Sequence, residues 1–388
     1  MKIYADTAAT TRPAPEVVEA MLPWLADAFG NASSVHHRGE AAREAVEQAR
    51  LEVARLVGAE GEEIVFTATG SEAINLALQG AMALAEGRNR LVITAIEHAA
   101  VIETAQALAA RGVPLTVVPV MANGMVDPEE LEAALGPDVA LVSVMAVNNE
   151  TGVIQPLEDI GVRVKAAGAL LHVDAVQAAG KLPISVDGWN ADLLSIAAHK
   201  FHGALGAAAL FVRRRTRIAP LVYGGQQERG RRAGTHNVPA IVGMGVAALR
   251  ARAALDAGEP AQVADRGERL LASLLMQVPD TRLNGDLNQR VGGIVNVCFA
   301  GVDGEAALHE LDLAGVTVST GSACSAGREG PSHVLTAMGL RPEEAHASVR
   351  FSIDHLTTAE DVQIIGQVTP PIIERLRALA GPAMEQSA

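Results

Sequence analysis

The sequence predicts an α/β protein in which a large domain, built on a mainly parallel sheet covered by helices, is followed by a smaller α/β domain. From about residue 15 to 250, helical patterns alternate with short runs rich in β-branched residues, as in consecutive βαβ units. Most of these runs are apolar throughout, which is typical of parallel strands buried on both faces. Beyond about residue 260, helical segments again surround strand-like runs, which indicates a second unit.

The elements of the larger unit follow from the spacing of its apolar residues. Residues 40–57 carry apolar side chains at helical intervals, which predicts an amphipathic helix. Further helices are expected over residues 71–84 and over residues 99–111, where Gly112 would close the last turn. A seven-stranded sheet is expected from the strand-like runs 63–67, 90–94, 115–119, 140–144, 170–173, 193–196 and 207–212.

A long segment rich in alanine and leucine, from about residue 239 to 258, predicts a helix that joins the two units. Within it, Gly243 and Gly245 match part of a dinucleotide-binding fingerprint, but Pro239 disrupts the strand that such a site requires. We therefore interpret these glycines as helix-packing residues. In the smaller unit, strands are expected at residues 294–299, 317–319 and 349–353.

The composition predicts a soluble globular protein: of 388 residues, 49% are hydrophobic and 20% are charged. The net charge of −14 argues against non-specific binding to nucleic acid or to anionic membranes. Residues 1–6 lack an apolar signal segment, so we expect a cytoplasmic protein. Two cysteines are too few for a disulfide framework, and the His36-His37 pair lacks further ligands at suitable spacing, so no metal site is expected.

Lysine is scarce, because Lys2, Lys165, Lys181 and Lys200 are the four lysines among 31 basic residues. Lys200 ends an apolar run, where burial would favour the neutral amine that forms a Schiff base. The alternative is a lysine at a strand end whose amine reaches solvent. Asp174 ends the preceding apolar run, where it could pair with a protonated ring nitrogen of a cofactor or simply cap a helix.

Residues 66–72 combine a strand, a turn of small residues and the start of a helix. The amides and hydroxyls around Gly70 and Ser71 suit a phosphate group, although the same residues also describe an ordinary helix N-cap. A lysine able to form an imine, an acid for a ring nitrogen and a phosphate site together predict a pyridoxal phosphate pocket.

Two cysteines and an arginine are further candidates for chemistry. Cys324 lies within residues 319–330, a run too small and polar to form a core, whereas Cys298 lies in an apolar run typical of buried, inert cysteine. To act as a nucleophile, Cys324 needs a lowered pKa or a proton acceptor. Arg350 lies within an expected strand, so its charge needs a partner, which could equally be a substrate carboxylate or an internal acid.

In this order, the clusters resemble those of the cysteine desulfurases, which are class V aminotransferases with the aspartate aminotransferase fold (fold type I). The resemblance runs over nearly the whole chain, through residues 6–11, 30–36, 97–98, 147–152, 172–177, 198–200, 227–235, 322–324 and 350–352. It implies a large cofactor-binding domain over residues 15–258. It also implies a small domain, formed by residues 1–14 and 259–388, that carries the catalytic cysteine.

The same resemblance implies that the cofactor is pyridoxal 5'-phosphate, bound covalently to Lys200. Asp174 would face the pyridine nitrogen, and His98 would stack on the ring. The remaining cofactor contacts would be Gly70, Ser71, Asn149, Gln177, His199 and, from the other subunit of a homodimer, Thr235.

The implied reaction removes sulfur from L-cysteine, releases L-alanine and leaves a persulfide on Cys324. Arg350, helped by Asn149, would bind the substrate carboxylate, and His98 would move the proton of the substrate thiol. The long segment from residue 324 to 331 resembles the subgroup that passes sulfur to iron–sulfur scaffolds or to tRNA-thiolating enzymes. The alternatives are a selenocysteine lyase, another pyridoxal phosphate lyase or aminotransferase of the same fold, or an inactive scaffold that binds sulfur-carrier proteins.

Overall fold

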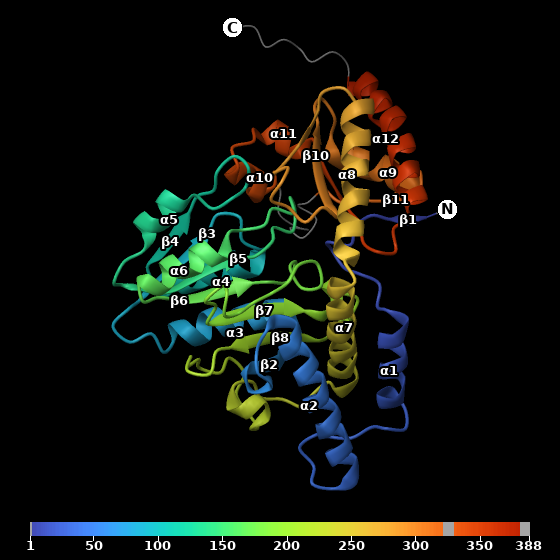
Figure 1. Ribbon diagram of the computed structural model, residues 1–388. Helices are drawn as coiled ribbons and strands as arrows, with labels where there is room; N and C mark the ends of the chain where they lie inside the picture. The colour runs from blue at the N-terminus through green and yellow to red at the C-terminus, as the bar shows by residue number, and fades with distance from the viewer. Residues whose placement is uncertain (1, 321–329, 381–388) are drawn as a thin grey trace.

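A seven-stranded sheet organises the larger part of the chain in the computed structural model, which describes residues 2–320 and 330–380 (Figure 1). The strand order is β2-β8-β7-β6-β5-β3-β4; the strands from β3 to β7 run parallel, and β8 runs antiparallel to both of its neighbours. The predicted fold class is confirmed, and each predicted strand of this sheet is found with its ends shifted by at most one residue. The strands are β2 (Ile64–Thr67), β3 (Arg90–Thr94), β4 (Leu115–Val118), β5 (Val139–Met145), β6 (Leu170–Asp174), β7 (Leu193–Ala197) and β8 (Ala208–Val212).

Helices cover both faces of this sheet because alternate strand residues point to opposite sides. Leu91 and Ile93 pack in one apolar cluster with α3 (Gly70–Met82) and α4 (Ala99–Ala109). Val92, between them, belongs to the cluster on the other face. That face is covered by α2 (His37–Val57), α6 (Leu157–Ala166) and α7 (Val238–Asp256), while α1 (Pro15–Leu25) packs on α7 and α5 (Pro128–Ala134) contacts β4.

The smaller unit has its own apolar core around an antiparallel sheet in the order β12-β10-β9. Its strands are β9 (Thr281–Leu283), β10 (Ile294–Phe299) and β12 (Ser348–Ser352), and its helices are α8 (Glu259–Gln277), α9 (Gly304–Leu313), α10 (His333–Ala337), α11 (Pro342–His346) and α12 (Ala359–Ala380). The strand expected at 317–319 is displaced, because β11 is Val316–Thr317 and Ser319 instead forms an isolated bridge with Arg350.

The N-terminal segment connects the smaller unit to the large sheet. β1 (Ile3–Tyr4) pairs in parallel with β11, and Asp6 forms a bridge with Ser352. A few residues later, the amide of Thr11 donates to the carbonyl oxygen of His199 at 2.9 Å. Residues 7–11 therefore pass directly over the end of β7.

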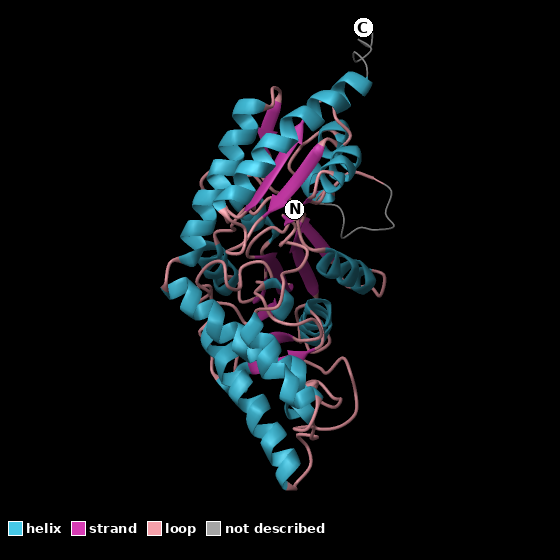
Figure 2. Cartoon of the chain, turned by 90° about the vertical axis from the view of Figure 1, so that its right-hand side faces the viewer, coloured by secondary structure: helices cyan, strands magenta, loops and turns pink. Residues whose placement is uncertain are grey.

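Helix α7 is long and apolar enough to span a membrane by length and composition. It packs against α1 and α2, however, and Gly243, Met244 and Gly245 are buried, as in the core helix of a globular unit. Figure 2 views the molecule from the side on which α7 lies, and it shows helices extending from the smaller unit at the top to the larger unit below. The predicted helix-packing role of the glycines is confirmed by the close approach of Met21 to Gly243 and of Ala49 to Gly245.

Gly245→Ala is expected to destabilise the protein by about 1–3 kcal/mol, because the added methyl would force two helices apart. A Cβ at this position would lie 2.6 Å from the Cα of Ala49 and 2.7 Å from its Cβ, so backbone would have to move. Urea unfolding measures the change, with Leu249→Ala on the exposed side of the same helix as the control. Stabilisation by Gly245→Ala, as helix propensity alone predicts, would contradict this packing.

Candidate active site

A pocket of about 260 Å³ opens at the carboxyl ends of the parallel strands. Ligands bind at this edge in α/β sheets, because the loops that follow the strands converge there. Asp174 ends β6, and Lys200 ends the short 3-10 helix η2 (Ala198–Lys200) that follows β7. The structure brings together these predicted residues around the pocket: Gly70, Ser71, His98, Asn149, Asp174, Gln177, His199 and Lys200.

The amine of Lys200 is held by the N-terminal segment. Its Nζ donates to the carbonyl oxygens of Ala8 at 2.6 Å and Ala9 at 2.7 Å. The carbonyl oxygen of Ala8 also accepts from Nε2 of Gln177 at 2.7 Å. The lysine is thus oriented by backbone acceptors, so it does not reach freely into solvent.

Asp174 is buried in the pocket wall, and its Oδ1 accepts from the amide of Val176 at 3.0 Å. Burial raises the pKa of this carboxyl, while the nearby His98, that amide and Lys200 act to lower it. A turn and not a helix follows β6, so the helix-cap interpretation of Asp174 is wrong, and its role at a ring nitrogen stays a prediction that its place in the pocket wall allows.

His98 caps the start of α4, where its Nδ1 accepts from the amide of Ala100 at 3.1 Å. In the neutral ring the proton therefore lies on Nε2. Burial lowers the pKa of His98; Asp174 raises it, and Lys200 and His333 lower it further. The ring is accordingly neutral near pH 7 and presents an N–H donor.

The N-terminus of α3 forms the polar end of the pocket. The Oγ1 of Thr69 accepts from the amide of Glu72 at 3.0 Å, and Oε2 of Glu72 accepts from the amide of Ala68 at 2.8 Å. This reciprocal capping fixes the turn that carries Gly70 and Ser71, whose position at the positive end of the helix dipole suits an anion. His199 lines the same pocket, and its Nδ1 is hydrogen-bonded to Oγ1 of Thr10 at 3.1 Å.

The donor set fits pyridoxal phosphate. An amine able to condense with an aldehyde, a buried carboxylate and a helix N-terminus line the same pocket in the combination that this cofactor requires. Burial, aided by the charges of Lys200 and Lys181, lowers the pKa of His199 to about 4. That residue is therefore a neutral hydrogen-bonding partner at physiological pH.

Two predicted residues, Arg350 and Thr235, do not line this pocket. Arg350 is buried, forms an ion pair with Asp6 at 2.7 Å and donates to the carbonyl oxygen of Asn149 at 2.9 Å. Asp6 is therefore an internal acid that partners Arg350, one of the two kinds of partner that we expected. The role of Arg350 in binding substrate stays a prediction. Thr235 is exposed on the loop before α7, and Cys324 lies outside the described residues. Cys298 is buried, as predicted, and burial raises its pKa.

The sequence did not reveal two parts of the site. The carbonyl oxygens of Ala8 and Ala9 belong to the backbone, and no side chain announces them. Glu97 is fully buried beside His98, with Oε1 accepting from Oγ1 of Thr94 at 2.6 Å and from the amide of Met145 at 2.9 Å. Burial raises the pKa of Glu97 to about 8, so it is largely protonated at neutral pH. The acidic residue shortly after the apolar strand β3 was the sequence signal that could have indicated Glu97.

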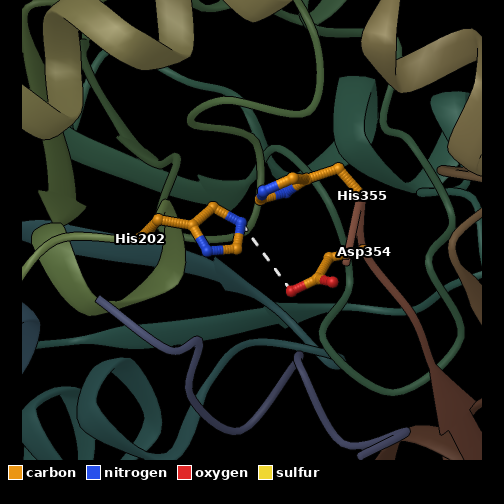
Figure 3. A group of neighbouring side chains, drawn as sticks. All are labelled: His202, Asp354 and His355. Carbon is orange, nitrogen blue, oxygen red and sulfur yellow. Dashed lines mark ion pairs between the residues drawn. The ribbon is translucent and has the colours of Figure 1, made fainter. Parts of the chain in front are cut away.

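A separate group lies between the two units, where His202, Asp354 and His355 place ligand atoms within 4.8 Å of one another (Figure 3). Nε2 of His202 is 3.7 Å from Oδ2 of Asp354. Nε2 of His355, however, lies 2.6 Å from Nη2 of Arg250. A guanidinium can only donate, so this nitrogen is an acceptor already in use and is not presented to a metal. The expectation of no metal site stays a prediction.

Known proteins resemble this chain over nearly its whole length. A family model described as aminotransferase class-V matches residues 3–365. A cysteine desulfurase from Trichormus azollae is 45% identical over 378 residues, which cover 97% of this chain and 94% of the relative. The solved structure of a NifS-like protein has a TM-score of 0.91 and 36% identity, covering 97% of this chain and all of that one. A structure described as SspA in complex with cysteine has a TM-score of 0.80 and 35% identity, covering 91% of this chain and 99% of that one.

Proposed function

The chain belongs to the aminotransferase class-V family and to the cysteine desulfurases within it, and on that premise we propose that L-cysteine loses its sulfur in the pocket around Lys200. The observation that supports this is the meeting of Lys200, Asp174 and the N-terminus of α3 around one cavity. Bound there, pyridoxal phosphate would supply an electron sink for bond changes at the substrate carbons. Lys200 would hold it covalently, with Gly70, Ser71 and His199 at the phosphate, Asp174 at the ring nitrogen, and Asn149 and Gln177 near the ring hydroxyl.

Lys200, released once the amino group of cysteine has displaced its Nζ, would act as the base that removes the Cα proton of cysteine. Its Nζ lies against the carbonyl oxygens of Ala8 and Ala9, which stabilise the ammonium formed when the amine takes up that proton. The carboxylate of Asp174, which lies near His98 and Lys200, would balance the positive charge of a protonated ring nitrogen. His98 would donate from Nε2 to the substrate sulfur, since Nδ1 is engaged by Ala100.

Cys324 would accept the sulfur. Its thiolate attacks the sulfur of the substrate, an S–S bond forms as the Cβ–S bond breaks, and the electron pair of the broken bond remains on carbon, which gains a proton to give L-alanine. The enzyme keeps a persulfide on Cys324, which it would pass to an iron–sulfur scaffold or to a tRNA-thiolating enzyme.

We further propose that the chain acts as a homodimer. Thr235 is exposed and lies outside the pocket of its own subunit. In a dimer it would reach the phosphate region of the other subunit, next to Gly70 and Ser71.

The guanidinium of Arg350, together with Asn149, would bind the substrate carboxylate. To do so, Arg350 would have to give up part of its ion pair with Asp6.

Incubation with L-cysteine followed by mass analysis of peptides tests this function. The peptide that contains Cys324 is expected to gain one sulfur atom, whereas the buried Cys298 serves as an internal control and should gain none. Cys324→Ser should keep the visible cofactor band and form no persulfide. A persulfide on neither cysteine, with L-alanine still produced, would favour a lyase without a cysteine acceptor.

A further inference from the structure

Lys181 is a partly buried lysine that the proposed reaction does not use. It is one of the four lysines of the chain. Its Nζ donates to Oε1 of Gln177 at 3.2 Å and to the backbone carbonyl oxygen of Lys200 at 3.3 Å. Among residues 2–320 and 330–380 it forms no salt bridge, so neutral groups solvate its charge. Withdrawing an ammonium from water without a carboxylate partner is costly, which points to a role beyond packing.

Two sets of hydrogen bonds connect Lys181 to Lys200, one direct and one through Gln177 and the carbonyl oxygen of Ala8. One bond goes directly to the carbonyl oxygen of Lys200. The other fixes the carboxamide of Gln177, because an ammonium only donates and must therefore face Oε1. The amide nitrogen then points to the carbonyl oxygen of Ala8, the same atom that accepts from Nζ of Lys200 at 2.6 Å.

The electrostatic surroundings of Lys181 are set by a cavity of about 190 Å³ between the two units, which it shares with Lys200. The other charged or titratable groups that line this cavity are His202 and Arg250 from the larger unit and Glu259, Arg290, Asp354 and His355 from the smaller. The two carboxylates are already engaged, Glu259 with Arg250 and Asp354 with His202, each at 3.7 Å. Burial and the charge of Lys200 lower the pKa of Lys181 to about 7, while Asp354 raises it.

We propose that Lys181 is a positioning residue for Lys200: it orients the carboxamide of Gln177, and its positive charge favours the neutral form of the Lys200 amine. A second cation beside a catalytic lysine has this effect because like charges disfavour protonation. The inference rests on the proposed function, since it takes Lys200 to be the lysine that binds the cofactor. Lys181 loses its proton as the pH rises through about 7, so its charge acts on Lys200 below that pH.

The test is the pH titration of the visible cofactor band in holoenzymes of wild type, Lys181→Met and Lys181→Gln. Removing the charge should move the midpoint of the band upward in both variants, by up to about one pH unit, with the full shift where the wild-type midpoint lies below the Lys181 pKa of about 7. Lys181→Gln keeps a donor for Gln177 and should retain more kcat than Lys181→Met, with KM little changed in either. Lys165→Met, which removes an exposed lysine bonded to Asn190, is the matched control and should leave the midpoint in place.

An unchanged midpoint in both Lys181 variants would overturn the proposal. A wild-type protein without a band that borohydride reduces would instead overturn the proposed function, so the two failures are distinguishable. If Lys181→Met does not fold, the Gln variant carries the comparison.

Discussion

Replacing Lys200 with alanine is expected to abolish the borohydride-reducible visible band and to slow turnover of L-cysteine by about 10⁴-fold, because both the covalent link and the base for the Cα proton are lost. No other amine lines the pocket within the described part of the chain. Absorbance of the purified protein before and after borohydride, together with the rate of alanine formation, measures both effects.

The fold should survive this substitution. The side chain of Lys200 bonds to the carbonyl oxygens of Ala8 and Ala9, and its loss removes bonds worth about 1 kcal/mol each. Lys165→Ala, at an exposed site, should keep the band and the activity. If the band persisted in Lys200→Ala, the cofactor would be held by another lysine, and Lys181 would be the first to test because it lies next to Lys200.

The strands and the side chains at their ends could be predicted from the sequence because both depend on short-range pattern. Every residue of β5 and β7 is buried, so an apolar run sufficed to mark each strand. Parallel strands end at one edge, which was enough to place Asp174 near Lys200. The helices α1, α5 and α6 were not predicted; α5 and α6 are short, with 7 and 10 residues, and Pro23 interrupts the helical pattern of α1.

What the sequence could not supply depends on contacts between distant segments. Arg350 meets Asp6, 344 positions away, because β1 pairs with β11 and Asp6 bridges Ser352 beside it. This pairing joins segments that are far apart in the sequence, and no local sequence pattern predicts it. The same pairing brings Ala8 and Ala9 to Lys200, so the backbone acceptors of its amine depend on tertiary structure and could not be predicted from the sequence.

Glu228→Gln is expected to destabilise the protein by about 3 kcal/mol, because it leaves the buried guanidinium of Arg50 without its main counter-charge. Glu228 accepts from Arg50 at 2.6 and 2.8 Å, from the amide of Phe66 at 2.8 Å and from Nε2 of His236 at 2.6 Å. Both charged side chains are at least 96% buried, with 4% of Arg50 and 1% of Glu228 exposed. Urea unfolding near pH 7 measures the loss, and Glu47→Gln, which removes the exposed carboxylate on the same arginine, is the control.

The pH dependence gives this prediction its sign. Burial alone would raise the pKa of Glu228, but the hydrogen bonds from Arg50 and His236 lower it from 4.5 to about 2. A carboxylate with a depressed pKa stabilises the fold above its unfolded pKa, and that stabilisation is lost as the pH falls through the folded value; a drop of this size corresponds to about 3 kcal/mol. The free energy of unfolding of the wild type should therefore approach that of Glu228→Gln between about pH 4.5 and pH 2. A constant difference across this range would show that Glu228 contributes packing alone, and the loop from η3 (Gln227–Gly230) to Thr235 would then have to be anchored by other contacts.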